Sequence, residues 1–152
     1  MLKKKLGIEG IETDWYSDEK LINYFKIPST LIIPKEVEGI GDYAFRDCKK
    51  LERVIFSNSN NLKCIWPGAF MDCIKLKKVT IPGSVVRIEN WAFSSCRELK
   101  KIEIPGSVEY IGDEAFWGCK NAEITIKKPE SMRYISPTAF KICKDVKEET
   151  RN

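Results

Sequence analysis

Cysteine is the residue type whose spacing in this chain most suggests chemistry, because thiolates bind metals, form disulfides and act as nucleophiles. Five of the six cysteines recur at steps of 25, 23, 23 and 24 residues: Cys48, Cys73, Cys96, Cys119 and Cys143. Each lies three residues after the phenylalanine of an Ala-Phe pair. No pair has the Cys-x-x-Cys spacing of a redox or zinc motif. The regular step predicts one cysteine per structural repeat, in a buried column where the thiol acts as a small apolar group.

Disulfides or a metal site are the alternatives for this column. Neighbouring helices pack about 8–10 Å apart, and a disulfide spans at most roughly 7 Å between Cα atoms. The expected spacing of the column therefore argues against disulfides. Cys64 lies outside the column, at a position that other repeats fill with Gly39, Arg87, Tyr110 and Tyr134, which predicts an outward-facing side chain. Cys64 is therefore the candidate reactive thiol. An incidental surface cysteine is the alternative, because no histidine or second cysteine is nearby to activate it.

The chain contains no histidine, which bears directly on enzyme function. Histidine is the commonest general base in enzymes, and its absence rules out Ser-His and Cys-His nucleophile pairs and most kinds of zinc site. The sequence also has no glycine-rich phosphate loop and no pair of carboxylates at a recurring spacing. We predict a protein that is not an enzyme and that uses neither a cofactor nor a metal.

The elements that position the cysteines are clearest in residues 79–101. Val79 and Ile81 alternate with a threonine, as in a half-buried strand. Pro82-Gly83 predicts a turn, and the later spacing of alanine, phenylalanine, cysteine and leucine favours one face of a short helix. Because one repeat cannot bury its apolar face alone, the stacked repeats must share one continuous core.

The recurrence of this pattern every 23–25 residues predicts an α/β fold: a right-handed leucine-rich-repeat solenoid of about five strand-plus-short-helix repeats. A helix over residues 17–25 is expected to close the first repeat, as part of an N-terminal helical cap in residues 1–30. The solenoid is expected over residues 31–147, followed by a charged tail, 148–152; no strand pattern follows Cys143. The expected repeats lie near residues 31–53, 54–78, 79–101, 102–123 and 124–147.

One repeat resembles the BspA-type leucine-rich repeat of bacterial and protist surface proteins. The matching positions are Ile104-Pro105, Val108, Ile111-Gly112, Ala115-Phe116 and Cys119, and the resemblance covers about residues 31–146. The resemblance implies a protein-interaction scaffold without an active site. It also implies a bacterial protein that is surface-exposed or secreted, and some members of the family are linked to adhesion. The chain shows no signal peptide, because glutamates and glycines replace the apolar stretch near its start.

The stacked strands are expected to form a sheet with one face toward solvent, and this face is the predicted binding surface for a protein or peptide partner. Strand alternation places eight residues on it: Arg53, Ile55, Lys78, Thr80, Lys101, Glu103, Glu123 and Thr125. Tyr110, Tyr134 and Trp117 are second-choice contacts, because aromatic side chains are enriched at interface hot spots. The alternative for Trp117 is packing across a neighbouring helix.

Two other functions are alternatives to partner binding. Self-assembly through the ends of the solenoid would give a homo-oligomer. The lysine pairs Lys77-Lys78 and Lys100-Lys101 suggest a weak polyanion site, but the net charge is only +4 and glutamates share the face, so nucleic acid is not the favoured partner. No apolar run approaches the roughly 18 residues of a membrane span.

Overall fold

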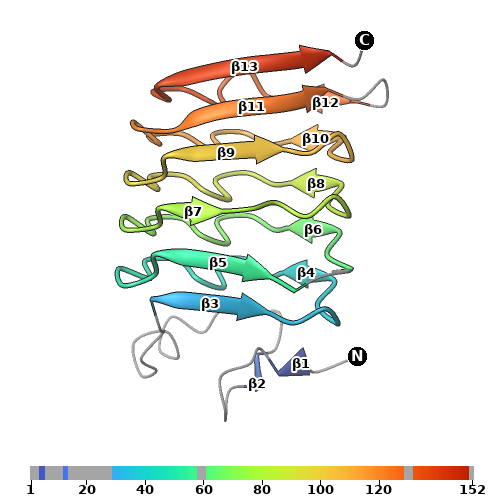
Figure 1. Ribbon diagram of the computed structural model, residues 1–152, viewed down its shortest axis with the longest axis vertical. Helices are drawn as coiled ribbons and strands as arrows, with labels where there is room; N and C mark the ends of the chain where they lie inside the picture. The colour runs from blue at the N-terminus through green and yellow to red at the C-terminus, as the bar shows by residue number, and fades with distance from the viewer. Residues whose placement is uncertain (1–3, 6–11, 14–28, 58–60, 129–131, 151–152) are drawn as a thin grey trace.

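The computed structural model describes residues 4–5, 12–13, 29–57, 61–128 and 132–150. Its main body is a stack of parallel strands wound into a solenoid (Figure 1). The first sheet has six strands in the order β13-β11-β9-β7-β5-β3. They are β3 (Thr30–Ile33), β5 (Arg53–Phe56), β7 (Lys78–Val79), β9 (Lys101–Ile104), β11 (Glu123–Lys128) and β13 (Asp145–Thr150).

A second parallel sheet of five short strands lies behind the first (Figure 1). Its order is β12-β10-β8-β6-β4. The strands are β4 (Gly39–Ile40), β6 (Cys64–Ile65), β8 (Arg87–Ile88), β10 (Tyr110–Ile111) and β12 (Tyr134–Ile135). Two residues are too few to show an alternating pattern, which is why the sequence does not reveal this sheet.

The core is built from columns of one residue type that run through successive rungs of the solenoid. In β9, Ile102 and Ile104 are buried while Lys101 and Glu103 are exposed. The phenylalanines of the Ala-Phe pairs stack on one another, and the ring centroids of Phe70 and Phe93 are 5.3 Å apart. Each rung therefore covers the apolar residues of its neighbour, and together they form one core.

The predicted α/β fold class is wrong, because the described residues contain no helix and the solenoid is made of parallel strands and turns. In each segment predicted to be a short helix, the residue before the cysteine has a positive φ: Asp47, Asp72, Ser95, Gly118 and Ile142. In four of the rungs the residue before the alanine has one as well: Tyr43, Gly68, Trp91 and Glu114. A right-handed helix cannot accommodate left-handed residues at this spacing.

The backbone amides of these turns form hydrogen bonds between rungs rather than along the segment. The N–H of Phe45 donates to the carbonyl of Ala69 at 2.8 Å, and the N–H of Phe93 donates to that of Ala115 at 2.7 Å. A helical N–H would instead bond the carbonyl four residues earlier. Inward positions recur every three or four residues in these turns as they do in a helix, so the apolar spacing alone does not separate the two structures.

The N-terminal helical cap is likewise not found in the described residues. Their N-terminal part consists of β1 (Lys4–Lys5) and β2 (Glu12–Thr13), which pair antiparallel. The helix predicted over residues 17–25 lies outside the described residues.

The last strand, β13, overturns the expectation that no strand follows Cys143. It pairs in parallel with β11 over six residues, from Asp145 opposite Glu123 to Thr150 opposite Lys128. Val146 is the sole apolar residue in this strand, so no alternation is visible in the sequence. The exposed backbone of β11 provides the hydrogen-bond partners that the side-chain pattern does not predict.

Candidate interaction surface

The outward side of the first sheet, here named the strand face, contains all eight residues predicted for partner binding. Seven of them are exposed and Thr125 is half-buried. Arg53 lies opposite Lys78, and Lys78 lies opposite Lys101, which in turn lies opposite Glu123. The structure therefore brings the predicted residues into one continuous surface, and binding of a partner to them stays a prediction.

Three acidic residues on or beside the strand face, Glu52, Glu103 and Glu123, pair with lysines. Lys127 lies 2.6 Å from Glu103 and Lys144 lies 2.5 Å from Glu123. The hydrogen bond from Lys144 lowers the pKa of Glu123. Glu52, just before β5, pairs with Lys77 at 3.1 Å.

Three cations on the strand face have no such partner. Arg53, Lys78 and Lys101 are exposed and occupy successive strands in one register, about 4.8 Å apart. Within the described residues, no carboxylate lies within ion-pair distance of any of them. The strand face thus carries an uncompensated positive column over β5, β7 and β9.

Two isoleucines add an apolar patch beside this column. Ile32 in β3 is 57% exposed, and Ile55, directly opposite it in β5, is 47% exposed. Sequence reasoning identified Ile55 but missed Ile32. The signal was present, because Ile32 stands between the inward positions Leu31 and Ile33 and must point outward by strand alternation.

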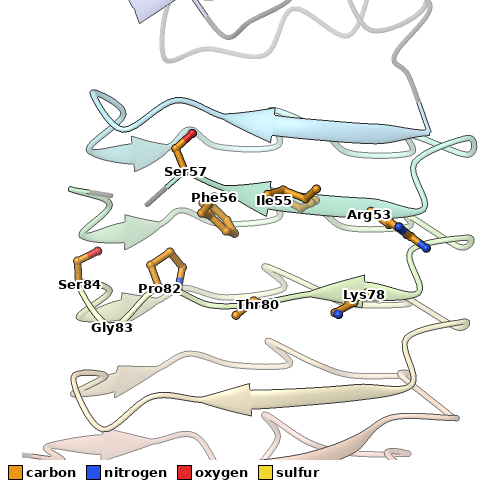
Figure 2. Close-up of a pocket in the computed structure, with 10 residues that line it drawn as sticks. Arg53, Ile55, Phe56, Ser57, Lys78, Thr80, Pro82, Gly83 and Ser84 are labelled. Carbon is orange, nitrogen blue, oxygen red and sulfur yellow. The ribbon is translucent and has the colours of Figure 1, made fainter. Parts of the chain in front are cut away.

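A groove of about 600 Å³ lies on the strand face between β5 and the segment that starts at β7. Figure 2 shows Arg53 and Lys78 at one end of it, and Phe56 and Pro82 toward the other. Thr80 lies between these ends. The groove is therefore cationic at one end, has the apolar residues Ile55, Phe56 and Pro82 along its length, and ends at Ser57 and Ser84.

The groove forms where neighbouring strands stop pairing. β5 pairs with β3 up to Phe56 opposite Ile33, but it pairs with β7 only up to Val54 opposite Val79. Beyond that point the next rung turns at Pro82, which has no N–H to donate to a strand ladder. Two residues of β5 are consequently left without partners in β7, and the space beside them is open.

The second-choice aromatic residues do not form one site. The rings of Tyr110 and Tyr134 stack at 5.3 Å on the second sheet, and the guanidinium of Arg87 lies 4.1 Å from the centroid of the Tyr110 ring. Burial, followed by the charge of Glu89, raises the pKa of Tyr110. Trp117 is 36% exposed and lies apart from the tyrosines, in the segment that connects β10 to β11.

The cysteine column is buried as predicted, apart from Cys143 in the last rung, which is half-buried. Sequence reasoning missed what the thiols do there. Four of the five donate to the carbonyl of the phenylalanine one rung earlier: Cys73 to Phe45 at 3.0 Å, Cys96 to Phe70 at 3.3 Å, Cys119 to Phe93 at 3.2 Å and Cys143 to Phe116 at 3.2 Å. The thiol of Cys48 donates within its own rung, to the carbonyl of Arg46 at 3.9 Å. Burial raises the pKa of Cys96 well above its usual range. The four thiols bonded to phenylalanine carbonyls therefore link successive rungs.

The prediction that Cys64 faces outward is wrong, because its exposed fraction is 7%. Burial and the charge of Glu89 raise its pKa to about 12, although Arg87 acts in the opposite direction. A thiol with so high a pKa forms little thiolate near neutral pH. The buried surroundings of Cys64 therefore argue against a reactive thiol at this position.

Metal-binding clusters and membrane-spanning helices are both absent from the part of the chain that the structure describes. Within it, no three His, Cys, Asp or Glu side chains are grouped so that they could hold a metal ion. The same residues include no helix with the length and apolar character to cross a membrane.

Parallel rungs with one repeat each and an open, charged strand face define a repeat solenoid, a class of protein that presents an extended surface. The family model described as BspA type leucine rich repeat region matches residues 9–147 in six copies. The chain belongs to this BspA-type leucine-rich repeat family, which confirms the resemblance seen in the sequence.

Solved structures of bacterial leucine-rich-repeat proteins are similar to this chain. A leucine rich cell surface protein from Faecalibacterium prausnitzii has 29% identity and a TM-score of 0.71, over 84% of this chain and 37% of its own. A leucine-rich repeat protein from Bacteroides ovatus has 29% identity and a TM-score of 0.63, over 82% and 37%. The pneumococcal vaccine antigen PcpA has 26% identity and a TM-score of 0.66, over 81% and 28%.

The chain thus spans little more than a third of the length of the first two structures and 28% of the third. No curated protein matches it.

Proposed function

We propose that this protein is a non-catalytic scaffold that binds a protein or peptide partner on the strand face. Family membership supports this role, because leucine-rich repeats of this kind generally mediate protein interactions. The observation that carries the proposal is the column of Arg53, Lys78 and Lys101, which have no carboxylate partner among the described residues, beside the exposed Ile32 and Ile55. Charged side chains without an internal partner, next to exposed apolar ones, suit contact with a second molecule.

We also propose that the protein acts at the cell surface or outside the cell. The support is the Faecalibacterium structure, which is described as a cell surface protein. Staining of intact source cells with an antibody against the purified chain tests this location. Labelling that appears only after the cells are permeabilised would contradict it.

The test of partner binding is capture by immobilised wild-type protein from source lysate and from host extracellular matrix. The Lys78→Glu/Lys101→Glu variant reverses two charges on the strand face and is expected to lose the captured protein. The matched control, Lys63→Glu/Lys120→Glu, makes the same charge change at exposed lysines outside the first sheet. Equal capture by both variants would remove the strand face from consideration.

Self-assembly is a second candidate, favoured by the last described rung. Ile142 is 56% exposed and Val146 is 37% exposed, although Val146 occupies the column that Ile124 fills with a buried side chain. Light scattering over a concentration series tests it. A mass that grows with concentration in wild type, and that stays monomeric in Val146→Lys, supports assembly through this end; a constant monomer mass contradicts it.

A further inference from the structure

We propose that the partner supplies an acidic segment, whose carboxylates pair with Arg53, Lys78 and Lys101 and whose adjoining apolar side chain lies in the groove between β5 and β7. The inference rests on the proposed function and adds to it the chemical class of the ligand.

The charges of the strand face favour an anionic ligand. Of the charged side chains on the strand face, the acids Glu103 and Glu123 already have lysine partners. The three cations of the column have none among the described residues, so they are the groups available to an incoming ion. Like charges about 4.8 Å apart repel one another, and a carboxylate between two of them relieves that repulsion.

The groove lies beside the cations. Arg53 and Lys78 line its entrance, and Ile55, Phe56 and Pro82 line the part beyond them (Figure 2). Arg53 and Phe56 are three residues apart in one strand, a separation of about 10 Å. An extended ligand covers that distance in about three residues. An acidic residue followed by an apolar one about three positions later therefore matches the groove.

The apolar part of the groove distinguishes an acidic peptide from a polyanion such as nucleic acid. A phosphate backbone would use the cations but would leave Ile55 and Pro82 uncovered, whereas a leucine side chain covers apolar surface. Nucleic-acid binding surfaces also place aromatic rings among the cations for base stacking. On the strand face, isoleucine and threonine lie beside the cation column, and the aromatic residue that lines the groove, Phe56, is half-buried against the core rather than placed between the cations.

The test is fluorescence anisotropy with short labelled peptides at low salt. The probe has consecutive acidic residues with a leucine about three positions after the first. One control peptide replaces the acids with their amides, and a second replaces the leucine with serine. An oligothymidine of equal charge serves as the polyanion. The acidic leucine peptide is expected to bind tightest, with about a tenfold loss for the amide peptide.

Protein variants locate the binding. The Arg53→Gln/Lys78→Gln variant is expected to bind the acidic peptide about tenfold more weakly than wild type, while Lys63→Gln/Lys120→Gln binds it with unchanged affinity. Thr80→Phe puts a large side chain in the middle of the groove and keeps a residue suited to extended structure. It is expected to reduce binding of the leucine peptide to the level of the serine peptide. Circular dichroism of each variant verifies that it is folded.

The outcomes separate this inference from the proposed function. Equal binding of the acidic and amide peptides, or tighter binding of the oligothymidine with no effect of the leucine, overturns the acidic-segment inference. If no peptide binds but Lys78→Glu/Lys101→Glu still abolishes capture of a partner, the inference falls and the strand-face scaffold stands. If capture also survives that variant, the proposed binding surface fails as well.

Discussion

Phe93 illustrates how a single residue contributes to this solenoid. Its ring is fully buried between those of Phe70 and Phe116, with centroid separations of 5.3 Å on both sides. Its carbonyl accepts a hydrogen bond from the thiol of Cys119, and its N–H donates one to the carbonyl of Ala115 in the next rung. One residue therefore stabilises the fold by stacking and by hydrogen bonds in the same direction, along the axis of the solenoid.

Replacement of Phe93 by alanine removes both stacking contacts and leaves a cavity. We expect Phe93→Ala to lower the free energy of unfolding by about 3–5 kcal/mol, measured by urea denaturation. The matched control is Ile32→Ala, which truncates an apolar side chain that is already 57% exposed and should cost under about 1 kcal/mol. Similar losses for the two variants would mean that the phenylalanine column is not the centre of the core.

The buried thiols make the stability depend on alkaline pH. Burial raises the pKa of Cys64 from 9.0 to about 12 in the folded chain. Above about pH 9 the unfolded chain releases this proton while the folded chain keeps it, so the stabilisation is complete below that pH and decreases between about 9 and 12. The decrease is at most about 1.4 kcal/mol per pH unit for this thiol.

Urea unfolding at about pH 8 and about pH 10 checks this expectation. The wild type should lose stability between these two values, and Cys64→Ala should lose less, because it lacks one of the titrating thiols. The comparison of slopes removes the contribution of the lysines, which both proteins share. An unchanged slope in Cys64→Ala would show that this thiol keeps an ordinary pKa in the folded state.

At the scale of the elements, the sequence predicts the strands of the first sheet except β13, and it does not predict the structure of the segments that connect them. Val79 and Ile81 alternate with polar neighbours, and a period-two pattern has one structural meaning. The segment from Ala92 to Leu99 has apolar residues at a spacing that both helices and compact turns satisfy. Only the left-handed residues, such as Trp91 and Ser95, separate the two, and neither is a residue type that announces a positive φ.

The close approach of neighbouring rungs gives a prediction for glycine. A Cβ at Gly112 would lie 2.6 Å from the backbone N of Asn90 and 2.9 Å from the carbonyl carbon of Glu89, so the second-sheet rungs would have to separate. We expect Gly112→Ala to lower the free energy of unfolding by about 1–3 kcal/mol. Gly83→Ala, whose Cβ would meet nothing within 4 Å, should be close to neutral. Equal effects in thermal unfolding would contradict this contact.

The candidate site was only partly predictable for a related reason. The outward positions of the strands follow from alternation, so Arg53, Lys78 and Lys101 could be placed on one face from the sequence. Their lack of ion-pair partners among the described residues depends on which lysines reach Glu103 and Glu123, and that requires the register of β11 and β13. The groove depends on a strand ladder that ends early, which no local pattern encodes.

For the whole molecule, the protection of backbone amides against hydrogen exchange should rise from the ends of the stack toward its middle. The N–H of Phe93 lies in an inner rung and donates to the Ala115 carbonyl at 2.7 Å, whereas β13 has a strand partner on one side within the described residues. Because each rung contacts mainly its neighbours, local opening at an end is less costly than opening in the middle. Hydrogen exchange followed by NMR should show slower exchange for Phe93 than for the amides of β13. Uniform protection would indicate that all the rungs open as one unit.

The turn amides and cysteine thiols that form hydrogen bonds between neighbouring rungs also determine how the protein responds to force. Tension applied at the two ends of the chain pulls along the stack and loads the contact between one rung and the next. When the end rung detaches, its hydrogen bonds to the neighbouring rung break, and that neighbour becomes the new end of the stack. Extension should therefore proceed in steps of one repeat, 23–25 residues or roughly 80 Å of extended chain, so the molecule would lengthen by increments under load.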